Sequence, residues 1–321
     1  MQSGLKFFGA AFSATLLTGL MAGSATWAAD APAPSARRYL NLVFAEHIRT
    51  GDVVFAENTN NLTGKLEKLT LRVFEPKGDK ETKRPLLILT PGGGFVRTED
   101  FWMDDFGEDL ARAGYVVAIN RYRLSSGINT PELYFDALFK AMSDQKAAVR
   151  YFVKDAAGAN RYKIDTDNIF IGGHSAGGIT SLHVAYLDAS DTMPEVMAAA
   201  MKKHGGLDGN SGNEKIPFKV RGVINLSGLV SDLDMLDPNE AALMSLHGDK
   251  DDVVAIGATA AGTFGSIPIH RRAESVGIRN ELHVIQGGEH NDTSDPQRCP
   301  ECIPLIKRFM FNTMVRTVKT N

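Results

Sequence analysis

The sequence predicts an α/β fold in which a mostly parallel central sheet carries helices on both faces. Short, almost wholly apolar runs recur along the chain after Pro85, as expected for strands that are covered on both faces. Stretches with apolar residues at helical spacing lie between these runs, and such alternation is typical of parallel sheets. A chain of 321 residues can bury one large core, so we expect a single domain.

Residues 1–28 have the pattern of a cleaved secretory signal peptide. Lys6 precedes an apolar stretch, and small residues lead up to Ala28, after which we expect cleavage. A retained membrane anchor is the alternative, but polar and glycine residues interrupt the apolar run, which is shorter than the roughly 20 residues of a span. We therefore expect a periplasmic or extracellular protein without a stable membrane anchor. Residues 29–38 should form a flexible lead into a domain over 39–321.

The charge balance offers no footprint for nucleic acid. The formal net charge of the whole chain is -3 and becomes -4 when Lys6 leaves with the signal peptide. A nucleic-acid-binding domain would instead carry a strongly basic surface. We therefore expect no nucleic acid among the partners.

The two cysteines, Cys299 and Cys302, lie close together in the sequence. In an oxidising compartment a local structural disulfide is the expected use of such a pair. Thiol catalysis or metal binding is the alternative. A zinc site, however, would call for further cysteine or histidine ligands at paired spacing, so we expect no metal.

The elements follow one another in a regular order. The segments 52–57 and 66–75 alternate in polarity like half-exposed strands and predict an antiparallel opening. Buried strands are then expected at 86–90, 115–120, 168–172, 220–226, 242–247 and 281–285. Helices are expected at 134–156, 268–276 and 303–317, where apolar residues recur on one face.

The segment 188–219 departs from this alternation. It combines a helical stretch at 195–203 with a polar, glycine-rich stretch at 208–214. A connection of this length is often a functional lid, so we expect a small cap-like insertion over an active site. A surface loop with no role in substrate binding is an equal alternative.

A G-x-S-x-G motif spans 173–177 and reads Gly-His-Ser-Ala-Gly. It follows the apolar run 168–172 and leads into a helical pattern, which is the strand, turn and helix that a nucleophile elbow requires. The flanking glycines let the strand and the helix pack closely. The motif alone occurs often by chance, but this context makes Ser175 the candidate nucleophile.

With this motif the sequence resembles the α/β-hydrolase superfamily, in particular its carboxylesterase and lipase branch with a glycine-rich oxyanion loop. The residues Pro-Gly-Gly-Gly-Phe at 91–95 look like the HGGG loop of that branch, although Pro91 replaces the usual histidine. The resemblance implies that the N–H groups of Gly93, Gly94 and Ala176 form an oxyanion hole for the tetrahedral intermediate. A glycine turn without a ligand is the alternative.

Three acids compete for the place of the triad carboxylate in the sequence His-Gly-Asp-Lys-Asp-Asp at 247–252. The segment is similar to the HGxxD segment of the family, whose spacing selects Asp251. Asp252 is the first alternative and Asp249 the second. A carboxylate is needed here to hold the catalytic imidazole in one tautomer and to stabilise the imidazolium that forms during attack.

His290 is the candidate general base, because it lies after the expected strand 281–285, in the loop where the family places its histidine. His283 is the alternative, but it falls inside that strand. We expect a structural role for His247 in the HG turn, and we expect His174 to pack beside the nucleophile. The resulting order of serine, acid and histidine is the one that this superfamily uses.

The resemblance implies a serine hydrolase that cleaves carboxylic esters through a catalytic triad and an acyl-enzyme, with no organic cofactor. We expect small-molecule or polymer-linked esters with short-chain or aromatic acyl groups as substrates. A peptidase or a lipase of the same superfamily is the enzymatic alternative. A catalytically dead binding relative is the alternative from another class.

Aromatic residues close to the oxyanion loop are candidates for a substrate pocket. Phe95, Phe101 and Trp102 could line an acyl or aryl site. The alternative is that they belong to the core beneath the helix that follows the loop.

Overall fold

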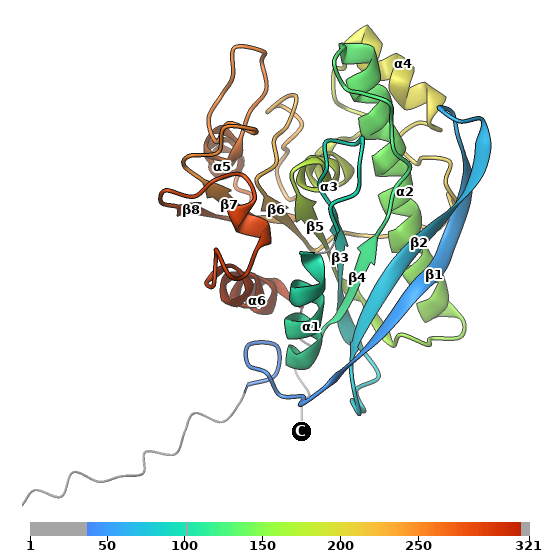
Figure 1. Ribbon diagram of the computed structural model, residues 1–321, viewed down its shortest axis with the longest axis vertical. Coiled ribbons are helices and arrows are strands. Elements are labelled where there is room, and N and C mark those ends of the chain that lie inside the picture. Colours follow the sequence, from blue (N-terminus) through green and yellow to red (C-terminus); the bar gives the residue numbers. More distant parts are fainter. Residues whose placement is uncertain (1–36, 101, 316–321) are drawn as a thin grey trace, which may run out of the picture. The chain divides into compact units, whose positions relative to one another are not determined.

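The protein, described here over residues 37–100 and 102–315 of a computed structural model, is built on one central sheet (Figure 1). The sheet has eight strands in the order β1-β2-β4-β3-β5-β6-β7-β8. β2 pairs antiparallel with both β1 and β4, and every other pair of neighbours is parallel. The strands are β1 (His47–Asn60), β2 (Lys65–Pro76), β3 (Arg84–Thr90), β4 (Val116–Asn120), β5 (Ile164–His174), β6 (Gly222–Leu226), β7 (Ala242–Gly248) and β8 (Asn280–Ile285).

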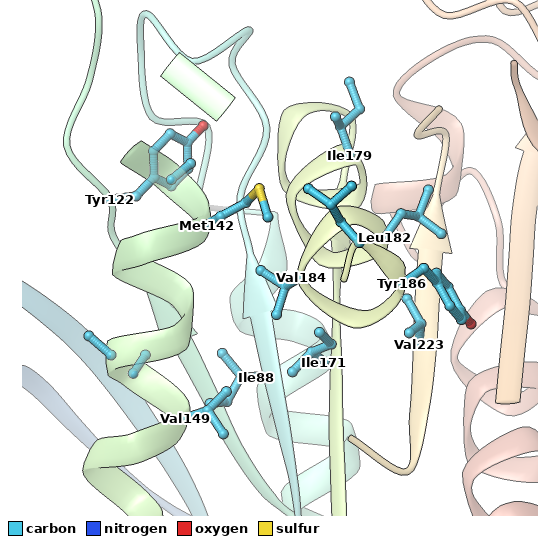
Figure 2. Close-up of a cluster of buried hydrophobic side chains, with 14 of the residues drawn as sticks. Ile88, Tyr122, Met142, Val149, Ile171, Ile179, Leu182, Val184, Tyr186 and Val223 are labelled. Carbon is cyan, nitrogen blue, oxygen red and sulfur yellow. The ribbon is translucent and has the colours of Figure 1, made fainter. Parts of the chain in front are cut away.

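Helices cover both faces of this sheet, because consecutive residues of each central strand point to opposite sides. In β3, Leu86 and Ile88 join the core under α2, α3 and α5, part of which is drawn in Figure 2. Leu87 and Leu89 join a second core under α1 and α6. The helices are α1 (Met103–Ala113), α2 (Pro131–Ala157), α3 (Ala176–Tyr186), α4 (Glu195–Lys203), α5 (Ser266–Ser275) and α6 (Cys302–Thr313).

The expected fold class is therefore confirmed, and the expected strands and helices all form. The main difference concerns the last strand, β8, whose six residues are all half-buried rather than buried. The reason is its position, because β8 pairs only with β7 and is the outer strand of the sheet. An edge strand loses the cover that neighbours give to central strands.

The parallel strands bring the predicted functional residues to one edge of the sheet. Ser175 follows directly on β5, and the glycine loop at 91–95 follows directly on β3. Asp251 comes three residues after β7, and His290 five residues after β8. Carboxyl ends of parallel strands share one edge, where open α/β sheets bind their ligands.

The segment 188–219 divides into two parts with different surroundings. Its helix α4 packs on α2, and the stretch after α4 is tied to the side of α2. Ser211 Oγ, for example, bonds to the buried pair formed by Arg123 and Asp144. The part of the segment after α4 is thus a packed connection along α2, whereas the part before α4 lines a cavity described below.

The expected signal peptide lies outside the described residues, as does most of the expected lead 29–38. Within 37–100 and 102–315, no helix combines the length and the apolar character that a bilayer-spanning helix needs.

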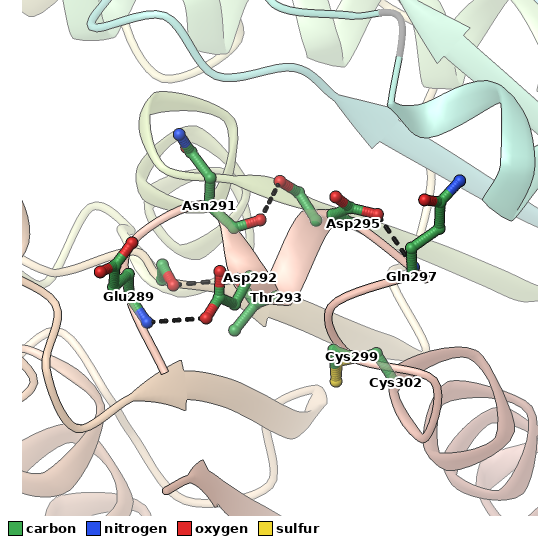
Figure 3. Close-up of a disulfide and its surroundings, with 10 residues drawn as sticks. Glu289, Asn291, Asp292, Thr293, Asp295, Gln297, Cys299 and Cys302 are labelled. Atoms are coloured by element: carbon green, nitrogen blue, oxygen red, sulfur yellow. Dashed lines mark hydrogen bonds between the residues drawn. A yellow bond between two sulfur atoms is a disulfide. The ribbon is translucent and has the colours of Figure 1, made fainter. Parts of the chain in front are cut away.

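Cys299 and Cys302 form a disulfide at the start of α6, as expected (Figure 3). Both residues are fully buried in the core beneath α1 and α6. The cross-link closes a short turn, in which Cys302 N–H donates to the carbonyl of Cys299. The same chain segment continues backwards to His290, so the disulfide anchors one end of the histidine loop.

Replacing Cys299 by Ser should therefore lower stability and leave the chemistry in place. For a loop this short, the entropy that the cross-link removes from the unfolded chain corresponds to about 2 kcal/mol of free energy of unfolding. Urea denaturation of the variant and of the wild type measures the difference, with ester turnover followed in parallel. Loss of all turnover in a stably folded variant would contradict a purely structural role.

Candidate active site

Ser175 occupies the sharp turn between β5 and α3, with φ 53° and ψ -119°. This conformation is strained for a residue with a side chain, and strained backbone of this kind is concentrated at functional sites. Its N–H donates to the carbonyl of Leu226 at 2.8 Å, which ties the turn to β6. The geometry is that of a nucleophile elbow.

The neighbouring glycines are required by the close approach of β3. A Cβ atom on Gly177 would lie 1.8 Å from the carbonyl oxygen of Thr90, and one on Gly173 would lie 2.2 Å from the same oxygen. No larger residue fits at either position without moving the backbone. The last residue of β3 is therefore pressed against both sides of the elbow.

The glycine loop continues from this contact and lies against the elbow. A Cβ atom on Gly92 would lie 3.2 Å from Cβ of Ser175. Gly93 and Gly94 both have positive φ, which turns the loop back on itself. Among the described residues, no group accepts a hydrogen bond from the N–H of Gly93 or Gly94. Ala176 begins α3, and its N–H likewise has no partner in the helix.

Of the three acids that compete by sequence, Asp251 is the one whose carboxylate contacts His290. Nδ1 of His290 lies 2.8 Å from Oδ2 of Asp251. Asp252 is exposed, and Asp249 accepts a hydrogen bond from the N–H of Gly287 instead. The turn that follows β7 thus brings to His290 the acid that the spacing selected, and neither of the two alternatives.

The Asp251 carboxylate is buried, yet it is held in its charged form. Burial by itself would raise the pKa of Asp251. Hydrogen bonding from His247 and His290 and from the N–H of Val254 outweighs that effect and keeps the pKa well below its usual value. A fixed negative charge is what orients an imidazole and stabilises its protonated form.

His174 links the elbow to the histidine loop, in agreement with the expectation that it packs beside the nucleophile. Its Nε2 lies 2.9 Å from the carbonyl oxygen of His290, and the two rings are 4.8 Å apart. Because a carbonyl only accepts hydrogen bonds, Nε2 of His174 carries the hydrogen. Burial, with the nearby His290, lowers the pKa of His174 to about 4, so this side chain stays neutral near pH 7.

Ser175 Oγ forms no hydrogen bond with any residue in the described ranges, His290 included. The residue before it, His174, is bonded to the backbone carbonyl of His290. Hydrogen bonds between nucleophile and base are often long or poorly aligned in structures without substrate. His283, the alternative base, lies on β8 beside Glu281 and takes no part in this arrangement.

The aromatic residues near the glycine loop do not line a common pocket in the part of the chain that the structure describes. The side chain of Phe95 is almost fully buried and packs edge-on against Tyr122 and Tyr134. Trp102 is 39% exposed at the start of α1, and Phe101 lies outside the described residues. Phe95 is therefore a core residue that supports the loop from behind, which was the alternative reading of the sequence.

A cavity of about 670 Å³ opens at the same edge of the sheet and was not foreseen from the sequence, and neither Ser175, Asp251, His290 nor the glycine loop lines it. Its walls come from the loops that follow β4, β6 and β7 and from the segment before α4. The ring of Tyr134 on its wall and the ring of buried Phe95 in the glycine loop are 6.2 Å apart. Four acids line it, Asp191, Asp232, Asp234 and Asp237, without any lysine or arginine. Such a pocket needs four distant loops to meet, which no local pattern encodes.

Comparisons with known proteins agree with this description. The model of the BD-FAE family matches residues 71–259, and no curated protein matches. A truncated carbohydrate esterase from gut microbiota has a similar fold, with a TM-score of 0.62 at 18% identity, covering 85% of this chain and 97% of that one. Esterase 2 of Thermogutta terrifontis, phosphorylated by paraoxon, has a TM-score of 0.60 at 17% identity, covering 84% and 96%. The same esterase with propionate bound has a TM-score of 0.60 at 17% identity, covering 83% and 96%.

Replacing Asp251 by Asn should lower ester turnover by about 10⁴-fold, since the amide no longer fixes the imidazole tautomer. Asp252→Asn is the matched control, because Asp252 is exposed one residue away and should keep most of the activity. Steady-state kinetics of both variants on one ester decides between them. Equal losses of activity in the two variants, or a greater loss in Asp252→Asn, would show that Asp251 is not the triad acid.

The stability of the fold should fall as the pH falls from 7 to 5. Burial lowers the folded-state pKa of His174 and of His183 to about 4 from an ordinary 6.5, so the unfolded chain takes up protons first. The loss is on the order of 2 kcal/mol per histidine over this interval. Burial raises the pKa of Glu240 to about 7, so protonation of this side chain adds stability as the pH falls and opposes the effect of the histidines. The measurement is therefore urea denaturation at pH 7 and at pH 5 of the Glu240→Gln variant, in which this contribution is absent. A stability that is constant or rises toward pH 5 would show that these histidines are not buried in neutral form.

Proposed function

Because this chain belongs to the BD-FAE family of α/β-hydrolase-like esterases, we propose that it is a serine hydrolase that cleaves carboxylic esters through Ser175, Asp251 and His290. The observation that carries the proposal is the buried Asp251–His290 pair beside a strained serine turn. All three residues follow parallel strands at the same edge of the sheet. This is the arrangement in which an imidazole can take a proton from a serine hydroxyl.

The reaction proceeds in two halves. Nε2 of His290 takes the proton of the Ser175 hydroxyl while Oγ attacks the ester carbonyl carbon. The carbonyl electron pair moves to oxygen, and the free N–H groups of Gly93, Gly94 and Ala176 stabilise the resulting oxyanion. His290 returns the proton to the departing alkoxide, which leaves an acyl group on Oγ.

Water completes the cycle. His290 takes a proton from the water as it attacks the acyl carbonyl, and the same three amides hold the second oxyanion. Collapse of this intermediate breaks the bond to Oγ, releases the carboxylic acid and returns the proton to the serine. Asp251 keeps its negative charge throughout and stabilises the imidazolium in both halves.

Short-chain or aromatic acyl esters are the proposed substrates, either free or attached to a polymer. The T. terrifontis esterase, which shares the fold, is described with propionate bound and with butyrate bound, which supports short acyl groups. Another similar structure is that of a carbohydrate esterase, which supports esters carried on sugars. We place one side of such an ester in the cavity that Tyr134 lines, which opens at the same edge of the sheet as the three proposed residues.

Secretion is part of the proposal. The disulfide at Cys299 and Cys302 requires an oxidising compartment to persist, and the N-terminal pattern of residues 1–28 is that of a cleaved leader. N-terminal sequencing of the protein recovered from outside the cytoplasm should show Ala29 as the first residue. A retained leader would contradict this.

A fluorophosphonate probe should label the wild type and leave Ser175→Ala unlabelled, because the probe phosphonylates an activated serine. Ester turnover of the same variant should fall by about 10⁵-fold or more. Heat-denatured wild type serves as the control for non-specific labelling. Equal labelling of both folded proteins would exclude Ser175 as the nucleophile, and absence of labelling in the wild type would favour a binding relative.

A panel of p-nitrophenyl esters of rising chain length, with feruloyl and acetylated-sugar esters beside it, should give the highest kcat/KM for short or aromatic acyl groups. An optimum on long acyl chains would favour a lipase instead. Cleavage of peptides in preference to esters would favour a peptidase.

A further inference from the structure

A buried chain of polar side chains runs behind the proposed triad and ends on its acid. It starts at Asn225 on β6, passes through Ser266 at the start of α5 and reaches His247 on β7. All three side chains have no exposed surface. Polar groups buried this deeply are retained only where each one has a partner.

The hydrogen bonds of this chain determine the tautomer of His247. Its Nε2 faces two acceptors, the carbonyl oxygen of Val254 at 2.9 Å and Oδ2 of Asp251 at 3.2 Å. An unprotonated Nε2 would set its lone pair against both oxygens, so Nε2 carries the hydrogen. The shorter, better-aligned bond goes to Val254, and Oδ2 lies within reach of the same N–H dipole.

The other ring nitrogen is then an acceptor. Nδ1 of His247 lies 2.8 Å from Oγ of Ser266, and this hydroxyl already accepts a hydrogen bond from Nδ2 of Asn225 at 3.2 Å. Among the described residues the Ser266 hydroxyl has no other partner, so Nδ1 is the acceptor for its hydrogen, and the ring hydrogen of His247 is on Nε2. Asn225 in turn is fixed by the N–H of Gly228, which donates to its Oδ1.

His247 also closes the turn that presents the acid. Oδ1 of Asp251 accepts from the N–H groups of Val253 and Val254, and the carbonyl of Val254 accepts from His247. Oδ2 of Asp251 is left for Nδ1 of His290. The acid is thus held at Oδ1 by a turn whose far end, the carbonyl of Val254, is bonded to His247.

We infer that His247 is a positioning residue for the triad acid. Its Nε2–H holds the 251–254 turn and places a dipole beside Oδ2, which sets the direction and the effective charge of the carboxylate that His290 meets. The inference deepens the proposed function and rests on it for its kinetic consequences. The tautomer of His247 follows from the contacts alone.

Removing the N–H dipole of His247 should change the pH dependence of the reaction in a definite direction. With less of its charge compensated, Asp251 would stabilise the imidazolium of His290 more strongly, so His290 would stay protonated to higher pH. The acid limb of the kcat/KM profile should therefore move to higher pH.

Other ionisable groups lie near this pair and stay unchanged in the variants. They are His174 on the elbow, Glu99 after the glycine loop, Asp249, Lys250 and Asp252 on the turn, and Glu289, Asp292 and Arg298 on the histidine loop.

The kinetic experiment compares His247→Leu with His247→Gln in the full-length protein. Leucine removes the donor, whereas the glutamine amide can place an N–H where Nε2 stood. We expect the leucine variant to lose about tenfold or more in kcat and to shift the acid limb upward by about half a pH unit, equivalent to a threefold change in the proton equilibrium. The glutamine variant should recover most of both effects.

His183→Leu is the matched control. This histidine is equally buried, on α3, and its two ring nitrogens are bonded to Ile179 and Ser231, away from the acid. Its loss should change stability without moving the acid limb. An acid limb that stays in place in folded His247→Leu, or one that moves equally in His183→Leu, would overturn the inference.

A spectroscopic test on the wild type does not depend on activity or on a folded variant. In protein labelled with ¹⁵N-histidine, long-range proton–nitrogen correlation should show His247 as the Nε2–H tautomer at neutral pH. An Nδ1–H tautomer or an imidazolium would overturn the inference even if the esterase activity is present. If the wild type hydrolyses no ester, the proposed function fails, while the tautomer still decides whether the chain of hydrogen bonds is correct.

Discussion

The packing of the Thr90 carbonyl between Gly173 and Gly177 is the constraint on which the rest of the site depends. It fixes β3 against the turn that carries Ser175, at distances that only glycine allows. The loop that follows Thr90 therefore brings Gly92 against the serine, and the unpaired amides of Gly93 and Gly94 come next along that loop. One close approach of two backbones thus positions both the proposed nucleophile and the loop of the proposed oxyanion hole.

The second requirement of the site is a charged carboxylate at Asp251. The Asp251 carboxylate is buried but receives hydrogen bonds at both oxygens, so its charge survives in a site from which water is largely excluded. These donors keep the carboxylate charged, and each N–H dipole offsets part of the charge that acts on the imidazole beside it. His174 and His247, on either side of this pair, are each bonded to a backbone carbonyl, the first to that of His290 and the second to that of Val254.

Local patterns predicted the fold and the serine because both are written in consecutive residues. The strands follow from short apolar runs, and Ser175 from a glycine-flanked motif after such a run. Spacing ranked Asp251 above its neighbours, but the contact with His290 depends on how a turn folds back, which spacing does not encode. For the same reason the sequence suggested Phe95 as a pocket residue, although its side chain is buried in the core under α2. The packing of the stretch after α4 along α2 relies on the buried pair of Arg123 and Asp144, residues too far apart to be matched by pattern.

The central claim is that an acyl group passes through Ser175. Rapid mixing with p-nitrophenyl acetate, followed by an acid quench in the first turnovers and mass spectrometry of the digested protein, measures this directly. The account requires a peptide containing Ser175 that is heavier by one acetyl group and that disappears as the substrate is exhausted. Hydrolysis that proceeds while this peptide stays unmodified, or an acetyl group that accumulates on another residue, would contradict it.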